Sequence, residues 1–474
     1  MATSEAATTD SHGWLNTETL KTRFGEFEFR KGYPTQAAAD ALYEQLTFNR
    51  AIEVYLTQIP AVAVMETRRG FERFGVKGST QTIVWEGLMD AKTLLLTANT
   101  ETVYCMGFLN LRNGPIVFEA PPKMLGNSMD ALQRFVVDFG PLGPDKGEGG
   151  KYLFLPPGDA SGDRPGHFTV RPQTFSVFYG LRGFKVDNKT DHAVGLMKRL
   201  KIYPLSESDN PPTMEFFNGS GQAIDTIHSD TITFFEALDQ IVQEEPADVF
   251  TPFERFHMQA IGIEKGKTFT PDRALLSEAA HTAAAFARAN CFASHDPNTF
   301  YYEGGHWQQL APGTPYTFVK DGVLQIDERA YVYYMGLGND PAMMEKHVGQ
   351  GSQYLWAYRD ADGDFLDGAK LYTLRVPPNV PIKNFWSVLV YDSLSRSELQ
   401  NSQAFPSVSM YGDPKTNDDG TIDIYFGPHC PPGQEKNWIE TLPDRGWFPI
   451  FRFYSPLEPF FDKTWKLPNI ERVK

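Results

Sequence analysis

The sequence has few cysteines, no long apolar run and no excess of basic residues. Its three cysteines, Cys105, Cys291 and Cys430, are widely spaced along 474 residues, which excludes a disulfide scaffold and a four-thiolate zinc site. No run of about eighteen apolar residues occurs, so no membrane-spanning helix is expected. The net charge of −15 and the pI near 5.2 disfavour nucleic acids and anionic membranes as partners, because both attract basic surfaces.

Motifs for metals, nucleotides and serine nucleophiles are also missing. The ten histidines form neither a His-x-His nor a His-Glu-x-x-His pattern, and no G-x-S-x-G elbow or helix-opening GxGxxG is present. The glycine-rich stretch 143–151 departs from the Walker pattern and is expected to be a flexible loop. We therefore predict neither a metal nor a cofactor. The segment from Met1 to Ser11 lacks a basic and then apolar pattern, so we expect no secretion signal and a cytoplasmic location.

Aromatic residues and turn formers are abundant and indicate a β-rich fold. The chain contains 36 Phe, 20 Tyr, 40 Gly and 34 Pro, a composition typical of antiparallel β-sandwiches with many turns. Short apolar segments bounded by Gly, Pro, Asn or Asp predict strands up to about residue 217 and again from about residue 353. Helical periodicity and capping residues predict helices at 37–71, after Ser229-Asp230, after Pro271-Asp272 and from Asp327, with Pro60 kinking or dividing the first.

These elements predict four regions along the chain. We expect a loose N-terminal arm over 1–35, a helix plus a β-sandwich over 36–225, a helical segment over 226–350 and a second β-sandwich over 351–474. The predicted fold class is therefore α+β and mainly β.

The segment NTETVY at 99–104 is predicted to be a strand that carries polar side chains. Alternation places Asn99 and Glu101 on one face and Tyr104 on the other. A carboxylate on an otherwise apolar face is costly unless it is paired or lies in a wet pocket. Glu101 is therefore a candidate general acid or base. The alternative is a salt-bridged carboxylate at the end of a strand.

A second run, FWSVLVYD at 385–392, has the same character. Trp386 and Asp392 share one face of this predicted strand, and Tyr391 lies on the other. Arginines also occur within predicted strands, as Arg182 and Arg452 show. Such an arginine either forms a buried pair with an acid or holds a substrate that bears a carboxylate.

These residues also carry a resemblance to a known family. NTETVY followed by GPIVFEAPP resembles domain of unknown function 1254. The stretch KLYTLRVPPNVPIKNFWSVLVYD resembles its companion, domain of unknown function 1214, together with Asn401, Asp419-Gly420, Asn437-Trp438, Leu442-Pro443 and Arg452-Phe453-Tyr454. The resemblance runs from about residue 45 to the end and implies two jelly-roll-like antiparallel β-sandwich domains with a helical insertion. Glu101 is a departure, because the family commonly has Asp there.

The expected function is that of a hydrolase or lyase acting on a small organic or carbohydrate-like molecule in a cleft between the two β domains. The predicted catalytic residues are Glu101, Asp392 and Tyr104; two carboxylates about 5–10 Å apart would suit glycoside chemistry. The predicted substrate-binding residues are Asn99, Arg182, Trp386, Tyr391, Asn401, Arg452 and Tyr454. The alternatives are a non-catalytic protein that binds a small ligand or carbohydrate, and a structural homo-oligomer.

Overall fold

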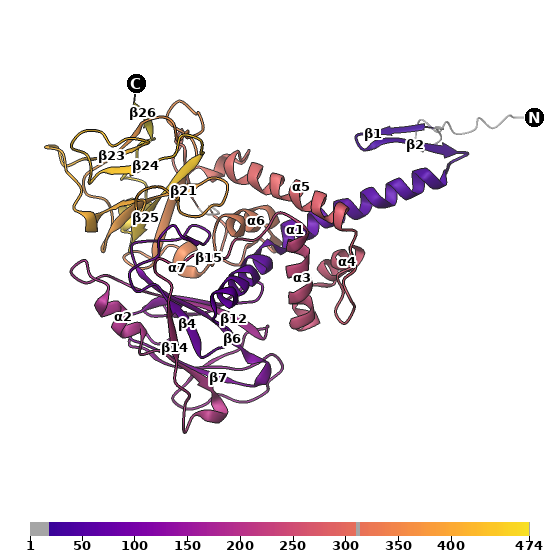
Figure 1. The fold of residues 1–474 in the computed structure, drawn as a ribbon, viewed down its shortest axis with the longest axis horizontal. Coiled ribbons are helices and arrows are strands. Elements are labelled where there is room, and N and C mark those ends of the chain that lie inside the picture. The colour runs from indigo at the N-terminus through magenta and orange to yellow at the C-terminus, as the bar shows by residue number, and fades with distance from the viewer. Residues whose placement is uncertain (1–18, 310–312, 474) are drawn as a thin grey trace, which may run out of the picture.

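The N-terminal and C-terminal strands form two separate β regions, and most of the helices lie beside the junction between them (Figure 1). The computed structural model describes residues 19–309 and 313–473. It confirms the α+β class, with eight α-helices in these ranges and many strands arranged in open sheets. Residues 1–18 of the predicted N-terminal arm lie outside the described residues.

Two sheets make up most of the N-terminal β region. The larger consists, in spatial order, of β14 (Glu215–Asn218), β4 (Gln81–Val84), β6 (Val103–Asn110), β12 (Ser176–Gly183), β8 (Leu125–Asp130) and β9 (Phe135–Phe139). The smaller consists of β11 (Phe168–Val170), β10 (Gly150–Phe154), β7 (Ile116–Ala120) and β13 (Lys201–Pro204), and a separate pair is formed by β15 (Ile224–Asp225) and β5 (Thr93–Leu94). Val103 and Cys105 of β6 share an apolar cluster with Phe118 of β7, so one core joins the two larger sheets.

The C-terminal β region repeats this plan. Its larger sheet consists, in spatial order, of β16 (Trp307–Gln309), β19 (Ser352–Ala357), β25 (Trp447–Tyr454), β21 (Trp386–Asp392) and β22 (Ser407–Ser409). Its smaller sheet consists of β24 (Trp438–Glu440), β23 (Ile422–Gly427), β20 (Tyr372–Val376) and β26 (Glu471–Arg472), and a hairpin joins β17 (Val319–Lys320) to β18 (Val323–Leu324). Val388 of β21 and Ile424 of β23 belong to one apolar cluster, which again joins two sheets.

The sheets are mixed, whereas the sequence predicts antiparallel ones. The pairs β14–β4, β15–β5, β11–β10 and β24–β23 are parallel. In the six-stranded sheet and in the two four-stranded sheets, the parallel pair is made by an edge strand. These edge strands are β14, β11 and β24, respectively. A strand that returns through a longer connection is free to pair in parallel, while a tight hairpin enforces the antiparallel arrangement.

The longest helix, α1 (Gln36–Phe74), starts and ends at the signals its sequence provides. The side chain of Thr35 accepts a hydrogen bond from the backbone N–H of Ala38, and Gly75 adopts the left-handed conformation (φ 115°) that ends a helix. Pro60 does not divide the helix, which continues through it. The remaining helices are α2 (Asp191–Met197), α3 (Ile232–Glu244), α4 (Pro252–Ala260), α5 (Arg273–Phe292), α6 (Ile326–Met335), α7 (Pro341–Met344) and α8 (Glu458–Phe461). Asp272 caps α5 as predicted, but α3 is capped by Thr231 and not by Ser229 or Asp230.

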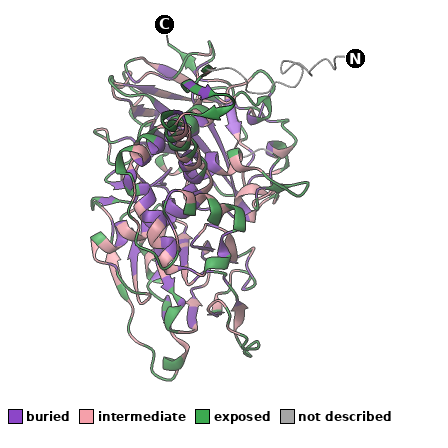
Figure 2. Ribbon diagram, turned by 90° about the vertical axis from the view of Figure 1, so that its right-hand side faces the viewer, coloured by how far each residue is buried: buried purple, intermediate pink, exposed green. Residues whose placement is uncertain are grey.

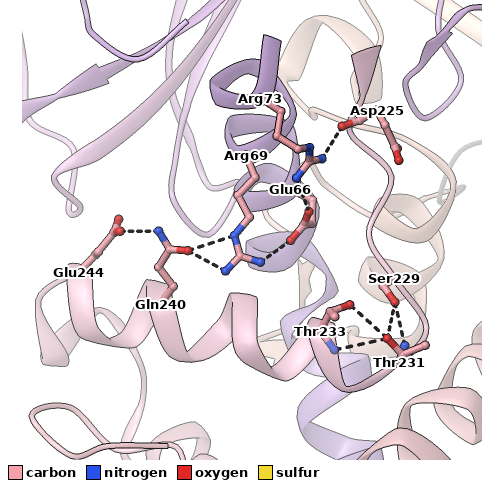
Figure 3. Close-up of polar contacts among 9 residues, drawn as sticks. All are labelled: Glu66, Arg69, Arg73, Asp225, Ser229, Thr231, Thr233, Gln240 and Glu244. Atoms are coloured by element: carbon pink, nitrogen blue, oxygen red, sulfur yellow. Dashed lines mark hydrogen bonds and ion pairs between the residues drawn. The ribbon is translucent and has the colours of Figure 1, made fainter. Parts of the chain in front are cut away.

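Polar side chains fasten α1 to α3, as Figure 3 shows. Arg69 donates to Gln240 Oε1 through Nε at 3.0 Å and through Nη2 at 2.7 Å, and to Glu66 Oε1 at 2.6 Å. Gln240 in turn donates to Glu244 Oε1 at 2.8 Å, and Arg73 donates to the backbone oxygen of Asp225 at 2.7 Å. This network fixes the position of α1 relative to α3 and to the backbone at Asp225, at the end of β15.

The helices cover the outer face of the larger C-terminal sheet. Leu389 and Tyr391 of β21 belong to the same cluster as the buried faces of α1, α3, α5 and α6, whereas Val388 and Val390 face the core between the two C-terminal sheets. The alternation predicted for 385–392 is therefore confirmed. Figure 2 shows the outcome, with buried residues in the interior of the sheets and along the helices, and exposed residues on peripheral loops.

Residues 19–34 form a small antiparallel sheet where the sequence predicts a loose arm. Its strands are β1 (Thr19–Thr22), β2 (Gly25–Arg30) and β3 (Tyr33–Pro34), and it lies at the beginning of α1, away from both β regions (Figure 1). Within the described residues, no helix combines the length and the apolarity needed to cross a membrane.

Candidate functional site

A cavity of about 120 Å³ lies between the larger N-terminal sheet and the larger C-terminal sheet. One wall comes from β6, β12 and β8, where cross-strand pairs place Tyr104 beside Arg182 and Met106 beside Gly180. Strands β19 and β25 supply the facing wall, which includes Arg452. The volume is close to that of an engineered core cavity of about 150 Å³ that binds benzene. The cavity thus suits a small organic molecule and lies between the two β domains, where the sequence predicts the cleft.

The cavity has a mainly apolar lining with a polar side. Its larger apolar side chains include Met89, Met106, Met129, Phe178, Met343 and Trp356. Its polar side chains are those of Thr97, Asn99, Tyr104, Asn127, Arg182, Tyr354 and Arg452. The sequence predicts four of these seven as site residues and misses Thr97, Asn127 and Tyr354.

The segment that carries Asn99 is a turn and not the predicted strand. Asn99 Oδ1 accepts a hydrogen bond from the backbone N–H of Glu101 at 3.0 Å, and β6 begins only at Val103. A side chain bonded to nearby backbone in this way competes with a strand ladder. The bend brings Asn99 Nδ2 to 3.3 Å from the hydroxyl of Tyr104 and 2.6 Å from that of Tyr454. The predicted placement of Asn99 and Tyr104 on opposite faces is therefore wrong.

Arg452 of β25 ties the C-terminal sheet to the N-terminal region. Its Nη2 donates to the backbone oxygens of Thr97 at 2.8 Å and Ala98 at 3.2 Å, and its Nη1 donates to the hydroxyl of Tyr391. The hydroxyl of Tyr391 donates to the same Ala98 oxygen at 2.5 Å. These bonds occupy much of the guanidinium, so Arg452 and Tyr391 act mainly to join the two regions.

Arg182 of β12 differs from Arg452 because, within the described ranges, its guanidinium has no comparable set of backbone partners. It lies 5.9 Å from the ring centroid of Tyr104, and Tyr354, which interacts with its charge, also lines the cavity. Within residues 19–309 and 313–473, no carboxylate lies within ion-pair distance of Arg182. An enclosed arginine without an acid partner suits an anionic group on a ligand.

The pKa of Tyr104 lies below the usual value for tyrosine. Burial by itself raises this pKa, but the charge of Arg182, the hydrogen bond from Asn99 and the charge of Arg452 together outweigh burial. Burial instead raises the pKa of Tyr391 and of Tyr454. Tyr104 therefore loses its proton more readily than these two neighbours, which is the property a general base needs.

Two family models match the sequence. Residues 80–204 match the model of the family described as protein of unknown function DUF1254. Residues 351–458 match the model of the family described as protein of unknown function DUF1214. The chain belongs to this two-domain family. The matches confirm the resemblance seen in the sequence, and they show that the DUF1254 domain contributes Tyr104 and Arg182 to the cavity while the DUF1214 domain contributes Tyr354 and Arg452.

Solved structures with a related fold include the VPA0106 protein from Vibrio parahaemolyticus. It is 20% identical, covers 90% of this chain and 100% of its own, and superposes with a TM-score of 0.55. An uncharacterized protein from Burkholderia cenocepacia is 12% identical, with coverage of 92% and 97% and a TM-score of 0.40. No curated protein matches the chain. The likeness to the Vibrio protein concerns the fold alone.

Two buried acids lie behind the DUF1254 wall of the cavity. Asn127 donates through Nδ2 to Asp340 Oδ2, and cross-strand pairing places Asp138 beside Asn127. Burial raises the pKa of both acids, and for Asp138 the charges of Asp340 and Glu345 help to raise it to about 8. Asp340 lies outside both matched domains. In the sequence, an Asp directly before Pro341 indicates the start of a helix, so sequence reasoning does not identify Asp340 as a site residue. In the described part of the chain, no group of three or more His, Cys, Asp or Glu is arranged to hold a metal ion.

Replacing Asp138 with asparagine should remove part of the pH dependence of stability. An acid with a pKa of about 8 in the folded state and about 4 in the unfolded state binds more protons when folded. The free energy of unfolding therefore falls as the pH rises through this window, by at most about 1.4 kcal/mol per pH unit. Urea unfolding between about pH 5 and pH 8 should show that the free energy of unfolding of D138N increases relative to that of the wild type as the pH rises. The exposed Asp209→Asn variant is the control, and parallel curves for D138N would contradict the prediction.

Glu101 of the DUF1254 domain faces a second depression, of about 170 Å³, at the same domain junction. Its Oε2 lies 3.0 Å from Lys185 Nζ, and its Oε1 accepts a hydrogen bond from Ser407 Oγ at 2.8 Å. The Lys185 ammonium also lies 4.0 Å from the ring centroid of Tyr411. The side chains of this pair are only 7% and 6% exposed, for lysine and glutamate respectively. Glu101 thus has the intramolecular partners that the salt-bridge alternative requires.

Glu101→Gln should lower the free energy of unfolding by about 3 kcal/mol, because it leaves the Lys185 ammonium buried without its counter-charge. Removing both charges, in Glu101→Leu with Lys185→Met, should cost less than either single change. Chemical unfolding of the wild type, the single variants and the double variant measures this coupling. Losses that simply add would show that the two charges are energetically independent.

Three predicted site residues of the DUF1214 domain lie elsewhere. Asp392 ends β21 and lies 3.2 Å from Arg445 Nη1. Trp386 stacks on Phe451, with centroids 5.3 Å apart, in the core between the C-terminal sheets. Asn401 donates through Nδ2 to a backbone oxygen of β24 at 2.7 Å. The contacts of these side chains are with the DUF1214 domain itself, so the structure does not bring them to the cavity.

Proposed function

We propose that the protein is a lyase or hydrolase that acts on a small organic acid in the cavity between its DUF1254 and DUF1214 domains. The observation that carries the proposal is the guanidinium of Arg182, which has no acid partner among the described residues and lies beside Tyr104 in a largely apolar cavity. An arginine binds a carboxylate through two parallel hydrogen bonds. The apolar lining suits a hydrocarbon body better than a carbohydrate, whose hydroxyls would lack partners beside Met and Phe side chains.

Tyr104 is the residue best placed to move a proton. As a phenolate it would take a proton from the carbon next to the bound carboxylate, and the C–H electrons would form a double bond as a leaving group departs from the adjacent carbon with its electron pair. Arg182 would stabilise the negative charge that develops on the carboxylate. In a hydrolase the same phenolate would take the proton of an attacking water. A paired-carboxylate mechanism receives less support, since Glu101 and Asp392 each have an ion pair of their own.

A panel of small carboxylic acids, each compared with its amide, tests the proposal by thermal shift and calorimetry. The acids should bind and raise the Tm, and the amides should not, because Arg182 requires a negative group. Gly180→Val is a matched variant: a Cβ added there meets nothing nearer than the Phe178 ring at 3.8 Å. The larger side chain should fill the cavity and abolish binding with the fold intact. Binding of acids and amides alike, or binding untouched by G180V, would reject the proposal.

The second candidate is a binding protein without catalysis. The hydrogen bonds from Asn99 to the hydroxyls of Tyr104 and Tyr454 favour it, because such a network also serves pure recognition. For the architecture, we infer that each pair of sheets is a jelly-roll-like sandwich, which the core shared by the paired sheets supports. A cytoplasmic location stays a prediction.

A further inference from the structure

The first part of α1 and the sheet of β1, β2 and β3 form an arm that extends away from the rest of the molecule (Figure 1). The helix has 39 residues, which corresponds to about 58 Å at 1.5 Å per residue. None of its residues from 39 to 50 is buried. The small sheet packs on the start of the helix through a cluster of Phe27, Phe29 and Ala38. A unit of this size buries too little apolar surface to be stable by itself.

The described part of the arm tip, residues 19–35, has a net positive charge, although the protein as a whole is acidic. Residues 19–35 contain four basic and two acidic side chains: Lys21, Arg23, Arg30, Lys31, Glu26 and Glu28. Two ion pairs of 2.9 Å use both acids, one with Lys21 and one with Arg30. Among the described residues, neither Arg23 nor Lys31 forms an ion pair.

Two acidic grooves lie beside α1 closer to the body of the protein. One, of about 580 Å³, is lined by Glu53 of α1 and Asp327 of α6. The other, of about 250 Å³, is lined by Glu44 of α1 and by Asp272 and Glu278 near the start of α5. Among the described residues, no lysine or arginine lines either groove. The larger groove therefore complements the charge of the described arm tip.

Exposed apolar side chains occupy the stretch of α1 between the tip and the larger groove. Tyr43 is 71% exposed and Leu46 is 40% exposed, and their spacing of three residues places them on one face of the helix. Both lie near the midpoint between Gln36, where the helix begins, and Glu53, at the groove. Two α1 helices packed antiparallel about this midpoint would cover these side chains. The same pairing would bring the basic tip of each copy to the acidic groove of the other.

We propose that the protein forms a two-fold symmetric dimer in which the arms of two copies lie side by side. A two-fold axis makes the same contact twice, so one arrangement covers the apolar stretch and satisfies both charged surfaces. An unrelated partner on the arm would leave the larger acidic groove of its own molecule without its complement. The occupant of the arm is therefore a second copy of this chain.

Sedimentation velocity of the full-length chain, from about 1 µM to 100 µM, tests the proposal. The wild type should be a dimer, or a larger assembly built from dimers. Tyr43→Glu with Leu46→Glu should weaken the dimer at least about tenfold, since two charges would enter the apolar contact. Val186→Glu, at a 49% exposed apolar residue of the N-terminal β region, should change nothing.

Reversing the charges of the arm tip and then those of the groove distinguishes this dimer from one with a different interface. Arg23→Glu with Lys31→Glu should weaken association about tenfold, and adding Glu53→Lys with Asp327→Lys should restore it. A monomeric wild type at about 100 µM would overturn the proposal, as would arm variants that associate like the wild type. Loss of association without rescue by the charge exchange would overturn the pairing of tip and groove.

Discussion

Arg182→Met is expected to weaken the binding of a small carboxylic acid by about 100- to 1000-fold, through loss of charge-assisted hydrogen bonds. Stability should not fall by more than about 1 kcal/mol, because no acid of the described residues pairs with the guanidinium and methionine fills a similar apolar volume. The charge of Arg182 lowers the pKa of Asp340, so this acid would hold its proton more firmly in the variant. Calorimetric titration and urea unfolding of the same preparations measure both quantities.

Arg452→Met is the matched control for this result. Arg452 lies in the same cavity, but its loss would remove a hydrogen-bond donor from the backbone oxygens of Thr97 and Ala98. Its free energy of unfolding should therefore fall by about 3 kcal/mol. The two variants should thus separate recognition from stability. If Arg182→Met destabilised the protein as much as Arg452→Met and left binding intact, Arg182 would be a structural residue.

Tyr104→Phe is expected to lower kcat by about 100- to 10,000-fold while the affinity for the acid changes little, since removal of a general base leaves the binding groups in place. The wild-type rate should rise with pH as Tyr104 loses its proton, with an apparent pKa below that of ordinary tyrosine. The variant should lack this dependence. Rates and affinities for the best ligand of the acid panel, measured across pH, provide the test.

Tyr454→Phe controls for the loss of a hydroxyl near the site. Its hydroxyl accepts a hydrogen bond from Asn99 at 2.6 Å but does not belong to the cavity lining. The rate of this variant should stay within about tenfold of the wild type. A wild type that binds acids but turns none of them over would favour the non-catalytic alternative, and equal losses in both tyrosine variants would assign Tyr104 no special role.

Local rules of sequence predicted much of the secondary structure. Alternation placed the side chains of 385–392 on the correct faces, because that stretch lies deep in a regular sheet. It failed at Asn99, where a side chain bonded to the backbone bends the chain before β6. At Pro60 the proline rule left a kink or a break open, and the helix is not broken there, because tertiary packing holds both halves together.

The β-rich class, the two-domain family and the residue types from which a site could be built can be predicted from the sequence alone. Which polar side chains have partners within the protein depends on its tertiary packing. Glu101 meets Lys185, and Arg452 meets the backbone of residues 97 and 98, across long separations in the chain. Arg182, also on a strand, lies beside the ring of Tyr104 and lines the cavity. Strand alternation names the face of a side chain, but its partner depends on which distant segment packs against that face.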